Sequence, residues 1–261
     1  MSATLGVKTK LTLAQAKELF KEHDITKLIA TSSGVIDTTY ITDNHIIKKY
    51  ERDVDVKKDN KLLKTLKKAS LNVPTCQAQN KEWFLYEKLK GSEPKNIQTY
   101  HIVALARFLS KFHTITFKKC DGEKLIQKRE TKELLNYTKD SFYLYYKKLE
   151  LLKNYNSKTD GLIHGDIFKD NTLFDGQKIA VFDFIDSACG SFGFDAGVCL
   201  VGFGVYKNNY FINLFLKIYN QKAPKKLSKK VLLYEIDMAR RYYALKRING
   251  YKNTKKAKEL L

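Results

Sequence analysis

LIHGDIFKDNTLF, at residues 162–174, is the stretch that decides the fold of this chain. It contains an HxDxxxxN pattern formed by His164, Asp166 and Asn171, set in a polar loop between two short apolar runs. The run VFDF follows and places Asp183 twelve residues after Asn171, at the end of an apolar segment. Polar loops between buried strands often carry the reactive side chains of a protein. Each piece is common by itself, whereas the joint pattern with this spacing is specific.

The residue types in this pattern suit the transfer of a phosphoryl group. Such a reaction needs a carboxylate that accepts the proton of the attacking hydroxyl, and side-chain oxygens that bind a metal on the nucleotide phosphates. Asp166 can act as the base, and Asn171 and Asp183 offer oxygen ligands of the kind that Mg²⁺ prefers. The alternative is that all three are turn-forming polar residues. We expect His164 to pack and orient the loop rather than to transfer protons.

The 261-residue chain is expected to divide at Lys90-Gly91-Ser92-Glu93-Pro94. Thr12 and Gln15 form a candidate capping box before a first helix. Before the boundary we expect strands over 28–30, 40–42, 45–50, 76–79 and 83–89 and a helix over 55–70. Beyond it we expect helices over 97–118, 124–155, 194–206, 210–220 and 228–249. The prediction is an N-terminal lobe over 1–89, a linker over 90–95 and a helical lobe over 96–261.

Composition limits the class of protein. Hydrophobic residues make up 43% of the chain, which is enough for a sizeable core. The formal net charge is +20, but the lysines are scattered and no nucleic-acid-binding motif is present, so we expect no specific nucleic acid partner. The chain starts without an apolar signal segment, and a cytoplasmic protein with no membrane partner is expected. The four cysteines lack metal-ligand spacing, and reduced thiols are expected for Cys76, Cys120, Cys189 and Cys199.

HGDIFKDNTLF, followed by VFDFIDSA and FGFDAG, resembles the aminoglycoside phosphotransferase and choline kinase superfamily. Within it, FKDN at 168–171 is most similar to the homoserine kinases of the kinase-like type, although this chain has Val-Gly-Phe at 201–203 where that family has Asn-Asp-Trp. The resemblance implies an α+β, protein-kinase-like two-lobed fold, with a small antiparallel sheet in the N-terminal lobe and a mostly helical C-terminal lobe. It also implies ATP and Mg²⁺ as cofactors.

The resemblance assigns nucleotide-binding roles in the N-terminal lobe. A turn containing Ser32, Ser33 and Gly34 would cover the phosphates. Lys48 would contact the phosphates, although Lys49 points to the other face of the same strand and could replace it. Further candidates are Asp59 as the carboxylate partner of that lysine, and Tyr86, Glu87 and Leu89 around the adenine.

In the C-terminal lobe, the resemblance makes Asp195 a structural acid that accepts backbone hydrogen bonds from the catalytic loop, with His164 as further support, and His113 a helix-end histidine of the core. A zwitterionic acceptor needs an acid for its ammonium and a base for its carboxylate. Asp186 could supply the first, and Arg240, Arg241 or Arg247 the second.

The implied reaction is ATP-dependent phosphorylation of the side-chain hydroxyl of L-homoserine, a step of threonine biosynthesis. Two alternatives stay open. Another hydroxyl kinase of the superfamily would act on choline, an aminoglycoside or methylthioribose. A non-enzymatic nucleotide- or nucleic-acid-binding protein would need the Asp166, Asn171 and Asp183 set to be inactive.

Overall fold

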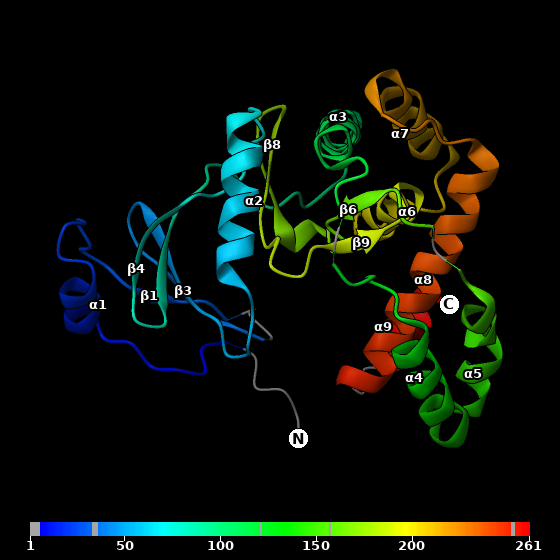
Figure 1. Cartoon of the computed structure of the whole chain (residues 1–261), viewed down its shortest axis with the longest axis horizontal. Helices are drawn as coiled ribbons and strands as arrows, with labels where there is room; N and C mark the ends of the chain where they lie inside the picture. Colours follow the sequence, from blue (N-terminus) through cyan, green and yellow to red (C-terminus); the bar gives the residue numbers. More distant parts are fainter. Residues whose placement is uncertain (1–5, 33–35, 121, 157, 252–253) are drawn as a thin grey trace. The chain divides into compact units, whose positions relative to one another are not determined.

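The computed structural model describes residues 6–32, 36–120, 122–156, 158–251 and 254–261 (Figure 1). Contacts divide the chain into two compact units, Met1–Lys90 and Gly91–Leu261. The first unit is built on an antiparallel sheet and the second is mostly helical. The α+β prediction is therefore confirmed.

The first unit contains a five-stranded sheet in the order β1-β2-β3-β5-β4, and every neighbouring pair is antiparallel. The strands are β1 (Ile29–Ala30), β2 (Thr38–Ile41), β3 (His45–Lys49), β4 (Cys76–Asn80) and β5 (Trp83–Glu87). β2 begins two residues before its predicted start because Thr38 pairs with Lys49. β4 reaches Asn80 because the chain reverses in a tight turn at Lys81, which adopts φ 53°.

Helix α1 (Leu13–Leu19) closes one face of this sheet. Its N-terminus has the predicted capping box: Thr12 Oγ1 accepts from the amide of Gln15, and the Gln15 side chain accepts from the amide of Thr12. Apolar residues of the helix and its flanks share one buried cluster with inward-facing strand residues, namely Leu11, Ala16, Phe20, Ile25, Tyr40, Ile47, Trp83 and Leu85.

Helix α2 (Val56–Lys68) buries Leu63 and Leu66, as its apolar spacing predicts. Asp55 is the N-cap, and its carboxylate accepts from the amide of Lys58. The helix ends before Ser70, which adopts a left-handed φ of 58°. The predicted helix was longer because the terminal residues keep helical spacing while their backbone has already turned.

The second unit is organised around buried helices. The helices are α3 (Thr99–Thr116), α4 (Lys128–Ser141), α5 (Tyr143–Leu149), α6 (Phe192–Gly202), α7 (Asn209–Lys222), α8 (Lys229–Tyr251) and α9 (Thr254–Leu260), with short 3-10 turns η1 (Glu150–Asn154) and η2 (Lys169–Asn171). α3 lies beside α7, and α6 lies against α8 (Figure 1). Residues 192–201 are all buried, so α6 is the central helix of the unit.

The single helix predicted over 124–155 is broken, which corrects that prediction. Phe142 adopts φ −145° and ψ 56°, so α4 ends there and α5 starts at the next residue. No glycine or proline marks the break, and apolar residues on both sides keep a helical spacing. The chain changes direction because Tyr146, Leu149 and Leu152 pack into the core beyond the break.

Two small antiparallel sheets carry the loops of interest. β6 (Gly161–Ile163) pairs with β9 (Ala188–Gly190), and β7 (Thr172–Asp175) pairs with β8 (Lys178–Val181). The loop after β6 holds residues 164–168, and the segment after β8 holds Phe182 and Asp183. None of the helices among the described residues has the length and the apolar surface that a membrane-spanning segment needs.

Candidate active site

The loop between β6 and β7 joins Asp166 directly to Asn171. The Asn171 side-chain amide donates to the Asp166 carboxylate at 2.9 Å and to the Asp166 backbone carbonyl at 2.8 Å. The turn η2 fixes this spacing, because the amide of Asn171 donates to the carbonyl of Phe168 at 3.1 Å. Both donor hydrogens of the Asn171 amide thus face Asp166, which leaves its carbonyl oxygen available as a ligand.

His164 connects this loop to the segment that carries Asp183. Its buried ring lies between two backbone groups: Nδ1 accepts from the amide of Asp166 at 3.2 Å, and Nε2 lies 3.1 Å from the carbonyl oxygen of Phe182. This pattern requires a neutral ring that carries its proton on Nε2. Burial supports that state, because it lowers the pKa of His164 from its usual value. His164 therefore positions the residues that flank both candidate catalytic carboxylates.

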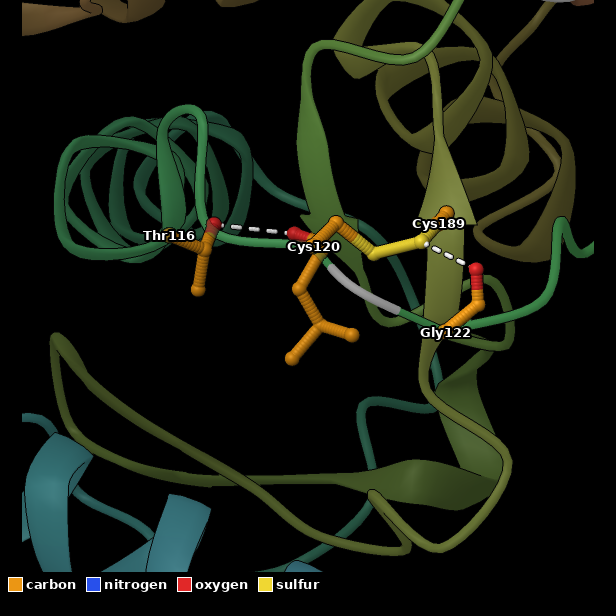
Figure 2. Close-up of a disulfide and its surroundings, with 5 residues drawn as sticks. Thr116, Cys120, Gly122 and Cys189 are labelled. Atoms are coloured by element: carbon orange, nitrogen blue, oxygen red, sulfur yellow. Dashed lines mark hydrogen bonds between the residues drawn. A yellow bond between two sulfur atoms is a disulfide. The ribbon is translucent and has the colours of Figure 1, made fainter.

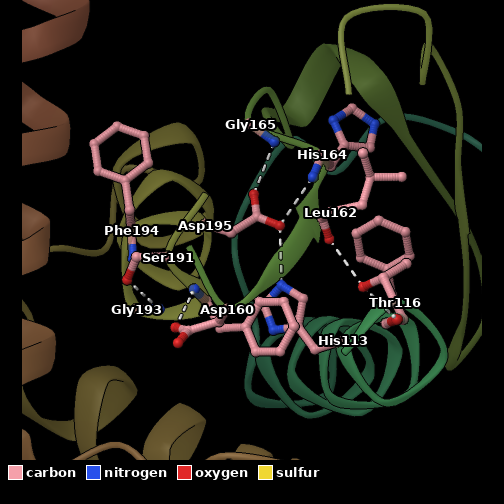
Figure 3. Close-up of polar contacts among 12 residues, drawn as sticks. His113, Thr116, Asp160, Leu162, His164, Gly165, Ser191, Gly193, Phe194 and Asp195 are labelled. Atoms are coloured by element: carbon pink, nitrogen blue, oxygen red, sulfur yellow. Dashed lines mark hydrogen bonds and ion pairs between the residues drawn. The ribbon is translucent and has the colours of Figure 1, made fainter. Parts of the chain in front are cut away.

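Asp195, in the first turn of α6, anchors the start of the loop (Figure 3). Its fully buried carboxylate accepts from the amides of His164 at 3.0 Å and Gly165 at 2.8 Å. A third partner is the ring of His113, whose Nε2 lies 3.0 Å from Asp195 Oδ2. Burial opposes the charge of Asp195, but the hydrogen bonds from His113 and from the amide of Gly165 outweigh it, so the pKa of Asp195 is lowered.

His113 belongs to the same buried cluster. Its ring stacks on Phe192, with centroids 3.9 Å apart, and its Nδ1 lies 2.7 Å from the hydroxyl of Tyr219. Burial lowers the pKa of His113, which keeps the ring neutral with its Nε2 proton directed at Asp195. Residues from α6 and α7 thus hold the α3 histidine that pairs with the Asp195 carboxylate.

Burial raises the pKa of Asp166 to about 7, and the carboxylates of Asp183 and Asp170 add to the effect. Asp186 contributes in the same direction. Four carboxylates therefore gather near the loop, and their mutual repulsion favours either a proton or a cation among them. A base that titrates close to neutral pH is suited to accept the proton of a hydroxyl.

Asp183 has a backbone conformation that is unusual for a residue with a side chain. Its φ is 66°, in the left-handed region, directly after the buried β8 strand. Such positions cost free energy and are concentrated at functional sites. Asp183 is exposed. Its carboxylate and the side-chain oxygen of Asn171 are ligands of the type that Mg²⁺ takes, usually one or two protein oxygens together with substrate phosphates.

The loop over 117–127 is a feature that the sequence did not reveal. Cys120 forms a disulfide with Cys189 of β9, so the expectation of reduced thiols is wrong for these two residues (Figure 2). The two cysteines are 69 residues apart, and only the fold brings them together. Further along the loop, the amide of Leu125 donates to the carbonyl of Cys189 at 3.0 Å.

Leu125 packs against the catalytic loop, which is the loop over residues 164–168 that contains Asp166. Gly165 has φ 75°, a conformation that strains residues with a Cβ, and a Cβ there would lie 2.6 Å from Leu125 Cδ2, so the Leu125 side chain would have to shift. The carbonyl of Leu125 also accepts from the Tyr242 hydroxyl of α8 at 3.1 Å. The disulfide and the backbone hydrogen bond to Cys189 therefore tie down the segment whose Leu125 side chain lies against Gly165, the residue before Asp166.

In the first unit, Lys48 and Lys49 lie on opposite faces of β3. Lys48 pairs with Phe84, lies 3.3 Å from Asp37 and is 4.6 Å from the centre of the Tyr50 ring. Lys49 lies opposite Trp83 and forms an ion pair with Glu82 at 2.8 Å. Both lysines therefore form ion pairs within the first unit.

The other nucleotide candidates are placed as follows. Ser32 is exposed, and Ser33 and Gly34 lie outside the described residues. Asp59 is buried on α2.

The candidate adenine-binding residues lie at the end of β5. Tyr86 is buried, with its hydroxyl 3.0 Å from that of Tyr50. The Glu87 carboxylate accepts from Lys67 at 2.8 Å and from Thr75 at 3.1 Å, and Leu89 is half-buried beyond the strand.

Arg240 and Arg241 have structural contacts on α8. Arg240 donates to the carbonyl of Leu260 at 2.7 Å, and Arg241 donates to Asp237 at 2.8 Å and to the carbonyl of Lys148. These contacts favour a role in holding α8 against its neighbours. Asp186 is exposed two residues before β9.

The sequence also missed Tyr243. Its hydroxyl donates to the carbonyl of Gly165, and its ring lies 4.9 Å from that of Phe168. No local pattern marks this residue, since it is one of several aromatic residues on a long helix.

Comparison with known proteins agrees with this geometry. A model of the phosphotransferase enzyme family (APH) matches residues 27–219. A homoserine kinase of Polaromonas naphthalenivorans (strain CJ2) is 39% identical over 57 residues, which span 22% of this chain and 18% of that protein. The local match therefore covers less than a quarter of either protein.

Solved structures resemble the whole chain. The ADP-bound aminoglycoside phosphotransferase APH(2'')-Ib has a TM-score of 0.69 at 20% identity, covering 96% of this chain and 97% of that one. Macrolide 2'-phosphotransferase MphH from Brachybacterium faecium has a TM-score of 0.67 at 16% identity, with 95% and 97% covered. These similarities confirm the protein-kinase-like fold. The family model covers well over half of the chain, and the chain belongs to the phosphotransferase enzyme family.

Proposed function

We propose that this protein is an ATP-dependent kinase that phosphorylates a hydroxyl group of a small molecule, and that L-homoserine is its acceptor. The observation that supports this most is the hydrogen-bonded pair of Asp166 and Asn171 in the loop that His164 connects to Asp183. The family match supports the reaction class.

In the proposed mechanism, Asp166 accepts the proton of the acceptor hydroxyl while the oxygen attacks the γ-phosphorus of ATP. The bond between that phosphorus and the β–γ bridging oxygen breaks, and ADP leaves. Asn171 holds the Asp166 carboxylate through its amide, and Asn171 and Asp183 are the proposed ligands of Mg²⁺. A bound Mg²⁺ would neutralise charge on the phosphate oxygens. Asp195 and His164 act by holding the loop.

For the nucleotide, we propose roles for residues of the first unit. Lys48 would contact the phosphates, with Asp37 as the partner that orients its ammonium group. Asp59 would support this site, and the turn with Ser32, Ser33 and Gly34 would cover it. Tyr86, Glu87 and Leu89 would line the adenine through backbone groups.

Homoserine as the acceptor is supported by the local similarity to a homoserine kinase and by Asp186, a carboxylate close enough to raise the pKa of Asp166. A second candidate is the hydroxyl of an aminoglycoside or macrolide. The structural neighbours favour it, because their names describe such kinases. These neighbours are at most 20% identical, however, which supports the fold alone.

Acceptor-dependent ADP release tests the proposal. Purified protein with Mg-ATP should release ADP with L-homoserine at a kcat/KM at least ~10²-fold above that for choline or kanamycin, because a site built to pair a carboxylate discriminates strongly against acceptors without one. Asp183→Ala should abolish release, since it removes a proposed metal ligand. A preference for kanamycin would replace homoserine by the second candidate.

A further inference from the structure

One face of α8 lies on the catalytic loop. The Tyr243 hydroxyl donates to the carbonyl of Gly165, the residue before Asp166. The Tyr243 ring also meets the Phe168 ring edge to face at 4.9 Å. Lys246 and Arg247 follow Tyr243 by three and four residues, so they project from the same face of the helix. Contact through Tyr243 therefore brings two cations beside the loop that carries the proposed base.

Arg247 makes a specific contact within that loop. Its guanidinium carbon lies 5.7 Å from the centre of the Phe168 ring, two residues after Asp166. A guanidinium held over an aromatic face uses the face of its plane and keeps its N–H groups, which lie along the edge, free to donate. The Phe168 ring thus positions Arg247 without occupying the donors that would bind an anion.

Lys246 approaches from the neighbouring position. Its ammonium lies 5.3 Å from the centre of the Tyr242 ring. The Tyr242 hydroxyl in turn donates a hydrogen bond to the carbonyl of Leu125, whose side chain packs on Gly165. Lys246 is exposed, although the protein atoms packed around its stem oppose its charge, and Tyr242 with the carboxylates of Glu130 and Asp186 raises its pKa. Lys246 is therefore a cation at neutral pH within the field of Asp186.

The other cations of α8 differ from these two. Arg240 donates to the carbonyl of Leu260 and forms an ion pair with Asp237. Arg241 donates to Asp237 and to the carbonyl of Lys148, so both arginines are engaged within the protein. For Lys246 and Arg247, no carboxylate of the described residues lies within ion-pair distance. Two cations held near reacting groups and kept from ion pairs are the arrangement expected of a receptor for an anionic ligand.

We propose that Lys246 and Arg247 bind a carboxylate, or another anionic group, of the acceptor and so restrict this kinase to anionic and zwitterionic alcohols. The proposal rests on the proposed function, because it concerns the acceptor of the same reaction. With Asp186 nearby, the site offers one carboxylate for an ammonium and two cations for a carboxylate, which complements an amino acid with a side-chain hydroxyl. A polycationic acceptor would meet repulsion from both cations.

Matched acceptors and matched variants test this assignment. Homoserine is compared with 3-aminopropanol, which lacks the carboxylate, with 4-hydroxybutyrate, which lacks the ammonium, and with kanamycin. Lys246→Gln with Arg247→Gln should lower kcat/KM for homoserine and hydroxybutyrate by about 10- to 100-fold, mainly through KM, because charged hydrogen bonds of that strength are lost. Aminopropanol should be almost unaffected. Lys230→Gln removes one charge from the exposed first turn of the same helix and should leave kcat/KM unchanged for all of these acceptors.

Two results would overturn the assignment. One is an equal loss for homoserine and aminopropanol, which indicates a structural role, and the other is no loss for either. Thermal-shift titration of the same acceptors separates this question from the reaction. Carboxylate-dependent binding without phosphorylation would refute the homoserine kinase proposal and support the anion site, whereas tighter binding of kanamycin than of homoserine would refute the anion site.

Discussion

At the scale of single residues, the candidate site depends on short local contacts around Asp166. Asn171 binds its carboxylate, and His164 accepts from its amide. The HxDxxxxN spacing predicted this grouping because all three residues lie within one loop. The spacing could not predict the pKa of Asp166, which depends on burial and on Asp183 and Asp170.

Asp166→Asn should lower kcat by at least ~10²-fold, since the substitution removes the proposed base while it preserves shape and hydrogen bonding to Asn171. ATP affinity should stay within about twofold. Steady-state kinetics checks the loss in kcat, and calorimetry of ATP binding without an acceptor checks the affinity. Full turnover by this variant would remove Asp166 from the mechanism.

The activity should fall as the pH drops below about 7, because Asp166 must be ionised to accept a proton and its pKa is raised to about 7. Asp170→Asn removes one of the charges that raise this pKa, so the acidic limb of kcat/KM should move to lower pH. A pH profile of both proteins measures the shift. An acidic limb that moves to higher pH in the variant would contradict this electrostatic account.

Asp195→Asn should lower the free energy of unfolding by about 2–4 kcal/mol, because an amide cannot accept from all three donors that Asp195 now satisfies, and each buried donor left unpaired costs about 1–3 kcal/mol. Urea denaturation measures the change. Asp175→Asn, at the exposed end of β7, is the control and should be nearly neutral. Equal stability of the two variants would refute the anchoring role.

At the scale of elements, the loop over 117–127 and helix α8 both reach the catalytic loop from distant parts of the chain. Leu125 packs on Gly165, and Tyr243 binds the carbonyl of that glycine. Gly165 is therefore held by contacts on two sides, and its left-handed backbone favours glycine at this position.

Removing the disulfide tests the importance of the 117–127 loop. Cys120→Ser should lower the free energy of unfolding by at most about 4 kcal/mol, the chain-entropy estimate for a closed loop of this length. A reducing agent should destabilise the parent protein similarly and leave the variant unchanged. Cys76→Ser, which removes a free thiol, is the control. Four titratable thiols in the denatured, unreduced protein would show that the disulfide does not form.

At the scale of the whole molecule, the net positive charge and the two buried neutral histidines both make the folded protein less stable as the pH falls. The chain has a formal net charge of +20, and His113 and His164 are buried and neutral with lowered pKa values. In the unfolded state these histidines bind protons near pH 6.5, whereas the native state does not. Unfolding is therefore favoured as the pH falls below that value.

In an Asp166→Asn background, which removes the opposing proton uptake of the native state at Asp166, the free energy of unfolding should decrease between pH 6.5 and 5.5, with each histidine adding a slope of up to about 1.4 kcal/mol per pH unit. Denaturation at a series of pH values measures this slope. High salt screens the surface repulsion of the net charge but leaves the histidine contribution. His164→Gln should reduce the slope, and a stability that does not change over this range would contradict the neutral state of both rings.

The sequence alone determined the residues that are close along the chain. The capping box of Thr12, the Asp166 and Asn171 pair and the position of Asp183 after a buried strand all depend on short spacings, which secondary structure converts directly into geometry. The resemblance of the same segment also predicted the protein-kinase-like fold.

Tertiary structure decided the contacts between distant segments. The partners of Asp195, the disulfide between Cys120 and Cys189, and the approach of Lys246 and Arg247 to the catalytic loop join residues that are tens of positions apart. No local periodicity reports such pairs, because each depends on how α3, α6 and α8 pack around one core. The same packing separates the engaged Arg240 and Arg241 from the two cations that we assign to the acceptor.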